Sequence, residues 1–108
     1  MLSKTPKRTN GKKVDDQAEV YVLQLFVTGI LPNSLRAIEN INVICEKYLE
    51  GRYELEIIDI YQQPGLALTK GIIAIPLLIK KFPLPEEKLI GDLSNTDKVL
   101  QLLHLNNY

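Results

Sequence analysis

The sequence predicts a single α/β domain with the element order βαβαββα, and three observations carry this prediction. An apolar run at 20–28 ends in a turn that contains Gly29 and Pro32. A segment with helical spacing follows, and a second apolar run occupies 53–60. Further along the chain, Pro76 interrupts a third apolar run. Because strand, helix and strand follow one another with short connections, the first two strands are expected to be parallel in a right-handed βαβ unit.

The first helix is predicted from the spacing of its apolar residues. They recur every three or four residues between Leu35 and Leu49, which leaves one buried stripe along a helix. Asn33 or Ser34 is expected to cap the start, because either side chain can accept from the free N–H groups of a first turn. Gly51 is expected just after the last helical residue.

The next elements are shorter. Pro64 suits the first position of a second helix, and Gly71 suits the position after its end. The run 72–79 is rich in β-forming residues, but Pro76 has no N–H to donate to a central ladder. An edge position, a bulge or a cis peptide bond would each resolve this conflict. A brief strand is expected at 88–90.

A last helix is predicted to close the chain. Residues 94–97 resemble a capping box, and the mainly apolar run 99–103 follows them. The complete order, with its proline-interrupted strand, is typical of the thioredoxin-like fold. The turn at 29–32 carries no Cys-x-x-Cys, however, so the dithiol chemistry of that fold is absent. We therefore expect the scaffold to serve another purpose.

The composition describes an ordinary globular protein of one domain, with 108 residues of which 45% are hydrophobic. Thirteen basic and thirteen acidic residues cancel, so the charge gives no reason to expect a nucleic-acid partner. No apolar run reaches the roughly 18–20 residues that a membrane span needs. Residues 1–19 hold five basic and three acidic residues and few apolar ones. We expect a flexible, solvated tail there rather than an anion-docking arm, followed by one domain at 20–108.

No catalytic constellation is evident. Cys45 lies on the apolar stripe of the first helix and is expected to be a buried, inert thiol, which fits a reducing cytoplasm. His104 is the single histidine, so neither a metal site nor a general base is expected around it. Asp59 ends a strand and is expected to be capped by local N–H groups. An interaction protein without cofactor or metal is therefore favoured over an enzyme.

Five segments between Tyr21 and Leu103 resemble motifs of the KaiB family, the clock-associated proteins that bind the ring ATPase KaiC. The segments occur in the family's order and spacing and together span about three quarters of the chain. The last of them, Ile-Gly-Asp-Leu-Ser, matches the family motif fully. The segments are 25–29, 32–37, 58–67, 75–78 and 90–94.

The resemblance implies a non-enzymatic regulator with two folds. One is a tetrameric ground state of order βαββααβ, and the other is a thioredoxin-like form that docks on KaiC. By resemblance, Tyr21, Asn33 and Arg36 are expected at the partner-binding surface. Glu54 and Glu56 are also expected there, but they stand where clock members tend to have a small residue and a lysine. Capture of the clock protein KaiA is therefore not expected, because reversed charge opposes a partner matched to lysine.

The choice between the two folds is expected to depend on five residues. Pro76, Gly91 and Asp92 belong to the family motifs. Leu102 and His104 stand where clock members usually have glycine and aspartate. Leucine improves helix propensity, and histidine removes a negative charge near a helix C-terminus. We therefore predict that the thioredoxin-like form dominates and that the ground-state order is disfavoured.

Three functional hypotheses follow. The first is an adaptor that binds a KaiC-type ATPase in a stress or output pathway outside a full oscillator. The second is a free-standing thioredoxin-like sensory or scaffold domain that recruits a histidine kinase or self-assembles. The third, redox catalysis through Cys45, is the least favoured. A homo-oligomer, dimer or tetramer, is expected through exposed apolar residues such as Ile30, Leu31 and Leu68.

Overall fold

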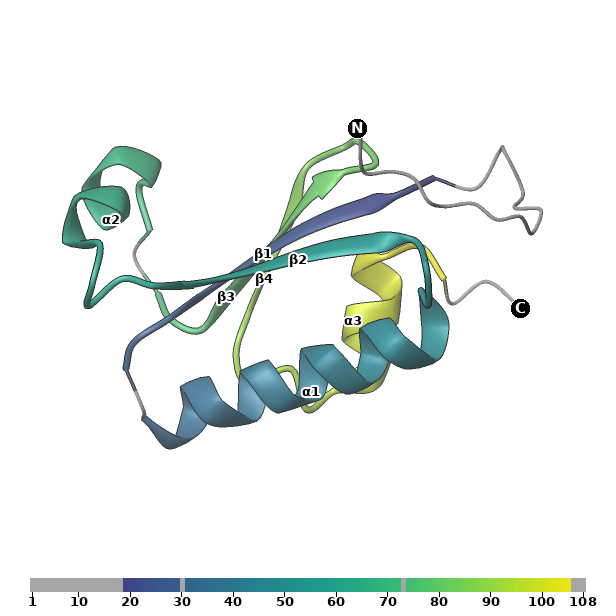
Figure 1. Ribbon diagram of the computed structural model, residues 1–108, viewed down its shortest axis with the longest axis horizontal. Helices are drawn as coiled ribbons and strands as arrows, with labels where there is room; N and C mark the ends of the chain where they lie inside the picture. Colours follow the sequence, from purple (N-terminus) through teal and green to yellow (C-terminus); the bar gives the residue numbers. More distant parts are fainter. Residues whose placement is uncertain (1–18, 30, 73, 106–108) are drawn as a thin grey trace.

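The computed structural model describes residues 19–29, 31–72 and 74–105, and these residues form the predicted order βαβαββα (Figure 1). The elements are β1 (Tyr21–Val27), α1 (Pro32–Tyr48), β2 (Tyr53–Asp59), α2 (Pro64–Lys70), β3 (Leu77–Phe82), β4 (Glu87–Ile90) and α3 (Thr96–Leu102). The predicted tail lies outside the described residues, apart from its last position. Within those residues, no helix is both long enough and apolar enough to cross a bilayer.

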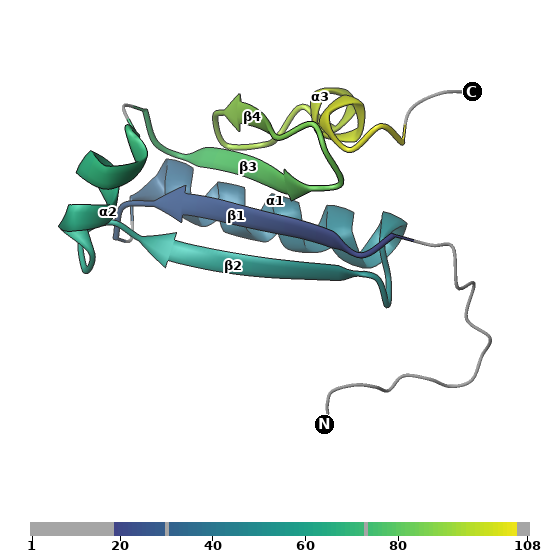
Figure 2. The ribbon, with the colours of Figure 1, turned by 90° about the horizontal axis from the view of Figure 1, so that it is seen from above.

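The four strands form one mixed sheet in the order β2-β1-β3-β4 (Figure 2). β1 and β2 are parallel, with Tyr21 opposite Tyr53 and Val27 opposite Asp59, which confirms the predicted parallel pair. β3 runs antiparallel to both β1 and β4. The sheet therefore has two edge strands, β2 and β4, and two interior strands, β1 and β3.

Helices cover the two faces of the sheet unequally. α1 and α3 lie on one face, and the main core forms between them and the sheet (Figure 1). α2 lies on the other face, near one end, above a smaller cluster made of Phe26, Ile58, Leu77 and Ile79. β1 is therefore covered on both faces at this end of the strand. Toward its start, Val22 and Gln24 are only partly buried.

α1 begins earlier than the sequence predicted. Leu31 is its N-cap and Pro32 its first residue, so Asn33 and Ser34 lie inside the helix, and the prediction that one of them caps it was wrong. Proline is favoured at the first position because its missing N–H is not needed there. The buried Ser34 instead accepts a hydrogen bond from the Thr28 N–H at 3.1 Å. This serine ties the end of β1 to the helix.

The residues at the two ends of α2 match the sequence prediction, whereas those at the two ends of α1 do not. Pro64 begins α2, and Gly71 follows it with a φ of +65°. At the end of α1, Leu49 is the C-cap and donates its N–H to Cys45 at 2.8 Å. Gly51, with a φ of +80°, therefore lies two residues beyond the cap, one later than predicted.

The third strand was placed too early by the sequence. β3 begins at Leu77 rather than at Ile72, so Pro76 precedes the strand, and the Ile75–Pro76 peptide bond is cis. Pro76 donates nothing, but its carbonyl accepts from the Gly91 N–H at 2.9 Å. Ile72 and Ile75 pack against the small cluster beneath α2. Their apolar character therefore serves the core and not the ladder.

The closing segment is helical, as predicted, and the order βαββααβ is not the one that this structure adopts. Asn95 is the N-cap of α3, and its side chain accepts from the Lys98 N–H at 3.2 Å. Val99, Leu100 and Leu102 are buried against the sheet. The predicted capping region is thus confirmed, with the asparagine as the capping residue.

Candidate functional site

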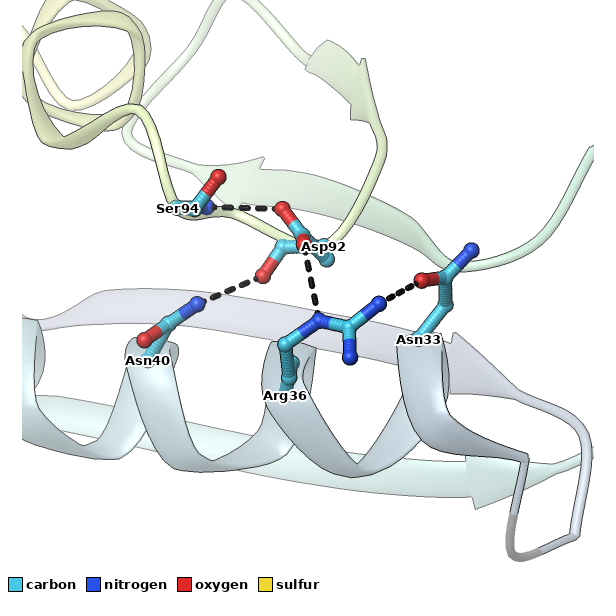
Figure 3. Close-up of polar contacts among 5 residues, drawn as sticks. All are labelled: Asn33, Arg36, Asn40, Asp92 and Ser94. Carbon is cyan, nitrogen blue, oxygen red and sulfur yellow. Dashed lines mark hydrogen bonds and ion pairs between the residues drawn. The ribbon is translucent and has the colours of Figure 1, made fainter.

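A polar cluster joins the first half of α1 to the loop between β4 and α3 (Figure 3). Its members are Asn33, Arg36, Asn40, Asp92 and Ser94, and we call it the α1–loop cluster. Positions 33, 36 and 40 lie on one helix face because they are three and four residues apart. Arg36 Nε donates to Asp92 Oδ2 at 3.1 Å, and a second guanidinium nitrogen of Arg36 donates to Asn33 Oδ1. Asn40 donates its side-chain N–H to the Asp92 carbonyl at 2.8 Å.

The loop itself is shaped by its backbone. Gly91 has a φ of +127°, a region that a Cβ disfavours. Asp92 Oδ1 accepts from the Ser94 N–H at 3.0 Å, which closes a turn that leads to Asn95. Leu93, at a φ of +65°, places its side chain in the main core. The residues Pro76, Gly91 and Asp92, named from sequence as fold-determining, therefore meet at this loop.

The carboxylate of Asp92 is stabilised in its charged form. Hydrogen bonds from the hydroxyl and the backbone N–H of Ser94, together with one from Arg36, lower the pKa of Asp92 below its usual value. Since the unfolded chain lacks these partners, it binds a proton at higher pH than the native protein does. The contribution of Asp92 to stability is therefore present above the unfolded pKa of about 4 and lost as the pH falls through the native value.

We expect Asp92→Asn to lower the stability at pH 7 and to flatten the loss of stability below pH 4. Urea denaturation of both proteins between pH 7 and pH 2.5 measures this, and the gap between them should shrink as the pH falls. Glu50→Gln changes an exposed carboxylate and serves as the control. A gap that stays constant over the whole range would show that the charge of Asp92 does not stabilise the fold.

The end of α3 is held by a second set of contacts. Leu102 is its last residue, the His104 N–H donates to Gln101 at 3.1 Å, and the Leu105 N–H donates to Leu100 at 2.8 Å. This pair of bonds is a Schellman motif, with His104 in the left-handed region at a φ of +60°. The Nε2 atom of His104 lies 3.3 Å from a carboxylate oxygen of Glu87.

His104 occupies a backbone position that favours glycine, because a Cβ is strained there. We expect His104→Gly to raise the free energy of unfolding by about 0.5–1 kcal/mol and His104→Val to lower it by about 1–2 kcal/mol. Thermal unfolding followed by circular dichroism measures both changes. Equal stabilities for the glycine and valine variants would mean that this end of α3 is frayed in solution.

The five predicted partner residues do not form one surface. Tyr21 is 6% exposed, and its hydroxyl donates to the Leu103 carbonyl at 3.1 Å, so it supports α3 from below. Asn33 and Arg36 lie together in the α1–loop cluster. Glu54 and Glu56 are exposed on the edge strand β2, on the side of the sheet where Ile58 lies and α1 does not. The sequence therefore grouped residues that the fold separates.

Asn40 and Ser94 were missed by sequence reasoning. Asn40 could have been found, because it lies one helical turn after Arg36 on the same face. Ser94 belongs to the family motif 90–94, but its hydrogen bond to Asp92 depends on the path of the loop after β4.

Cys45 and Asp59 both have roles in the folded structure rather than in a catalytic site. Cys45 is buried, and burial raises the pKa of its thiol to about 12, which leaves little thiolate at neutral pH. Asp59 Oδ1 accepts from the Tyr61 N–H at 2.9 Å, which is the local capping expected from sequence, and also from the N–H of Gly29, 30 residues away, at 3.0 Å. Among the described residues, no group of three or more His, Cys, Asp or Glu side chains could hold a metal ion.

A hollow of about 320 Å³ lies between the start of α1 and Pro76. Its walls include Leu31, Pro32 and Ile75, and no cysteine lines it. The fold and its sites thus define a thioredoxin-type α/β domain without a dithiol.

Comparison with solved structures supports this class. The chain superimposes on the N-terminal domain of Synechococcus elongatus SasA with a TM-score of 0.65 at 23% identity, covering 93% of this chain and 98% of that one. The germline thioredoxin Deadhead of Drosophila melanogaster gives 0.65 at 10% identity, covering 82% and 83%. At these identities the likeness shows the fold alone, and it confirms the thioredoxin-like prediction.

Comparison of sequences places the protein more narrowly. The KaiB domain model matches residues 24–105. The circadian clock oscillator protein KaiB of Thermostichus vulcanus is 48% identical over 82 residues, which are 76% of this chain and 76% of that protein. The protein of the same name from Synechococcus elongatus is 44% identical over 82 residues, or 76% and 80%. The chain belongs to the KaiB family, and membership in this family of clock proteins supports the prediction of a non-enzymatic role.

Proposed function

We propose that this protein is a cytoplasmic adaptor that binds a KaiC-type ring ATPase through the surface around Asn33 and Arg36. Family membership supports the partner, because the relatives are named as clock oscillator proteins. The particular pathway, a stress response or signalling output outside a full oscillator, is part of the proposal. The observation that carries it is the 3.1 Å contact between Arg36 and Asp92, which couples an exposed side chain to the loop that precedes α3.

Arg36 is suited to such a role by its geometry. Its side chain is 53% exposed, although Asp92 and Asn33 hold its guanidinium in place. A fixed guanidinium loses little conformational freedom when it meets a carboxylate of a partner. Asp92 contacts Arg36 only when the loop before α3 has the conformation seen here. A partner that binds the Arg36 guanidinium in this position would therefore favour the thioredoxin-like form. Tyr21 would act indirectly, by holding the end of α3.

The acidic side chains on the edge strand β2 limit which proteins can bind there. Glu54 and Glu56 are exposed on one side of this strand, and Glu56 also accepts from the Gln24 side chain at 3.1 Å. We propose that this edge repels a partner matched to lysine, so that a KaiA-type protein is not captured.

The test is binding to a purified KaiC-type ATPase, measured by biolayer interferometry. We expect the native protein to bind at micromolar concentration and Arg36→Glu to weaken binding at least tenfold. Lys47→Glu makes the same charge change at the exposed far end of α1 and should leave binding unchanged. Circular dichroism verifies that each variant is folded. Failure of the native protein to bind at tens of micromolar would contradict the proposal.

A second candidate function is self-assembly as a scaffold, and two exposed side chains favour it. Leu31 is 57% exposed beside α1, and Leu68 is 87% exposed on α2. Exposed leucines near one end of a small domain are suited to contact between copies. We propose a dimer or tetramer, and sedimentation equilibrium of the native protein and of Leu68→Glu measures it. A native protein that stays monomeric at high concentration would exclude this candidate.

A further inference from the structure

The edge strand β4 and the helix α3 enclose a shallow hollow of about 370 Å³. Residues 87–89 line it from β4, and Lys98, Leu102 and His104 line it from α3 and its end. Leu89 lies on the α3 side of the sheet, because it pairs with Leu78 of the main core. The hollow therefore has an apolar floor, made by Leu89 and Leu102, below the edge of the sheet.

The edge above this hollow is open to pairing. Among the described residues, β4 pairs with β3 alone, on one of its two sides. In an antiparallel strand, alternate residues direct their N–H and C=O groups away from the existing neighbour. Extended peptides add as a further strand to exposed sheet edges of this kind.

The charged side chains around this edge favour a partner segment of one charge. Glu87 is already engaged, since its carboxylate lies 3.7 Å from Lys80 Nζ and 3.3 Å from His104 Nε2. Lys88 and Lys98 are both exposed, and neither forms an ion pair with any described residue. A second copy that paired through its own β4 would bring its own lysines to the same groove, so charge opposes that arrangement. An acidic segment is attracted.

The two lysines would meet different faces of an added strand. Lys88 pairs with Ile79 and so points to the side of the sheet away from α3. Lys98 projects from α3 on the other side. Successive side chains of a strand alternate between these sides. A segment of alternating acidic and aliphatic residues would place acids beside Lys88 and aliphatic groups over Leu89 and Leu102, with Lys98 at the rim.

We propose that the groove between β4 and α3 is a docking site for an extended acidic segment of another protein, which adds to β4 as a fifth strand. This site is separate from the α1–loop cluster. The opposite edge does not compete for such a segment, because Glu54 and Glu56 there repel it.

The test uses the full chain and a fluorescein-labelled peptide of seven alternating glutamate and valine residues. Fluorescence anisotropy should show binding at least tenfold tighter than for the matching lysine–valine peptide. Lys88→Glu and Lys98→Glu should each weaken binding about three- to tenfold. Lys47→Glu, the same charge change far along α1, should not. Amide NMR shifts should map to residues 87–90 and to α3.

Four results would overturn the proposal. They are no binding of the acidic peptide, equal weakening by Lys47→Glu, shifts confined to β2, and undiminished binding of an acidic peptide whose alternate backbone nitrogens are methylated. The last result would show that side-chain charge alone holds the peptide, without strand pairing. Circular dichroism tests whether each lysine variant is folded, and Lys98→Gln provides a milder change whose effect should lie between native and Lys98→Glu.

Discussion

Replacing Leu103 with alanine is expected to remove about 3–5 kcal/mol from the free energy of unfolding. Leu103 is the C-cap of α3, its side chain is 0% exposed, and it lies in the main core between the helices and the sheet. Truncation loses the buried methyl groups and leaves a cavity that the surrounding side chains fill only in part. The Leu103 carbonyl also accepts the Tyr21 hydroxyl at 3.1 Å, so movement of α3 weakens a buried hydrogen bond.

Urea denaturation at pH 7 measures this loss, with Leu68→Ala as a matched control. Leu68 is 87% exposed, so the same truncation there should change stability by less than about 0.5 kcal/mol. The free energy of unfolding of small domains is about 5–15 kcal/mol, so this loss is a large share of it. We therefore expect partly unfolded forms to be populated in the Leu103 variant. A loss below about 1 kcal/mol at Leu103, or backbone NMR shifts of a strand at 99–103, would contradict the helical closing segment.

Phe26→Ala is expected to cost about 3–5 kcal/mol, because it empties the small cluster beneath α2. Phe26 is 0% exposed and packs with Ile58 and Leu77 on the face of the sheet that only α2 covers. With so few buried neighbours, the loss should loosen α2 before the whole domain unfolds. Amide hydrogen exchange at 64–70, together with urea denaturation, measures both effects.

The control for Phe26→Ala is Tyr61→Ala, which removes an aromatic ring that is largely exposed. It should leave the free energy of unfolding nearly unchanged. If α2 exchanges at the same rate in Phe26→Ala and in the native protein, then α2 is held by contacts other than this cluster.

Comparison of particular elements shows where sequence reasoning succeeds. The parallel β1 and β2 pair was predictable because two apolar runs flank one amphipathic helix with short connections. The helical end of the chain was predictable because Asn95 is a strong capping residue ahead of an apolar run. Each of these signals depends on residues close together in sequence, so tertiary packing does not change what it predicts.

The errors came from competition between neighbours in space. The apolar residues before Pro76 fit a strand by composition, but Ile72 and Ile75 are used to fill the cluster beneath α2. Lys80 contradicts a buried strand by its charge, yet it is 1% exposed in β3 with Glu87 at 3.7 Å. A sequence pattern indicates which residues are buried, but it does not indicate which part of the fold buries them.

The residues of the candidate site could be predicted in part from sequence, but their contacts could not. Arg36 and Asp92 could be named from family motifs, but their 3.1 Å contact joins residues 56 positions apart. Tyr21 was expected at the surface, and the register of β1 places it beneath α3 instead. Residue identity thus indicated importance, while only packing determined which residues face solvent.

The sequence by itself determined the order of the elements, the absence of a dithiol and the helical close of the chain, because each depends on residues near one another along the backbone. Only the tertiary structure decided that Arg36, Asn40 and Asp92 meet, that Glu54 and Glu56 stand apart from them, and that β4 offers an open edge beside two lysines. These juxtapositions arise from burying one face of the sheet under two helices and only part of the other under a third.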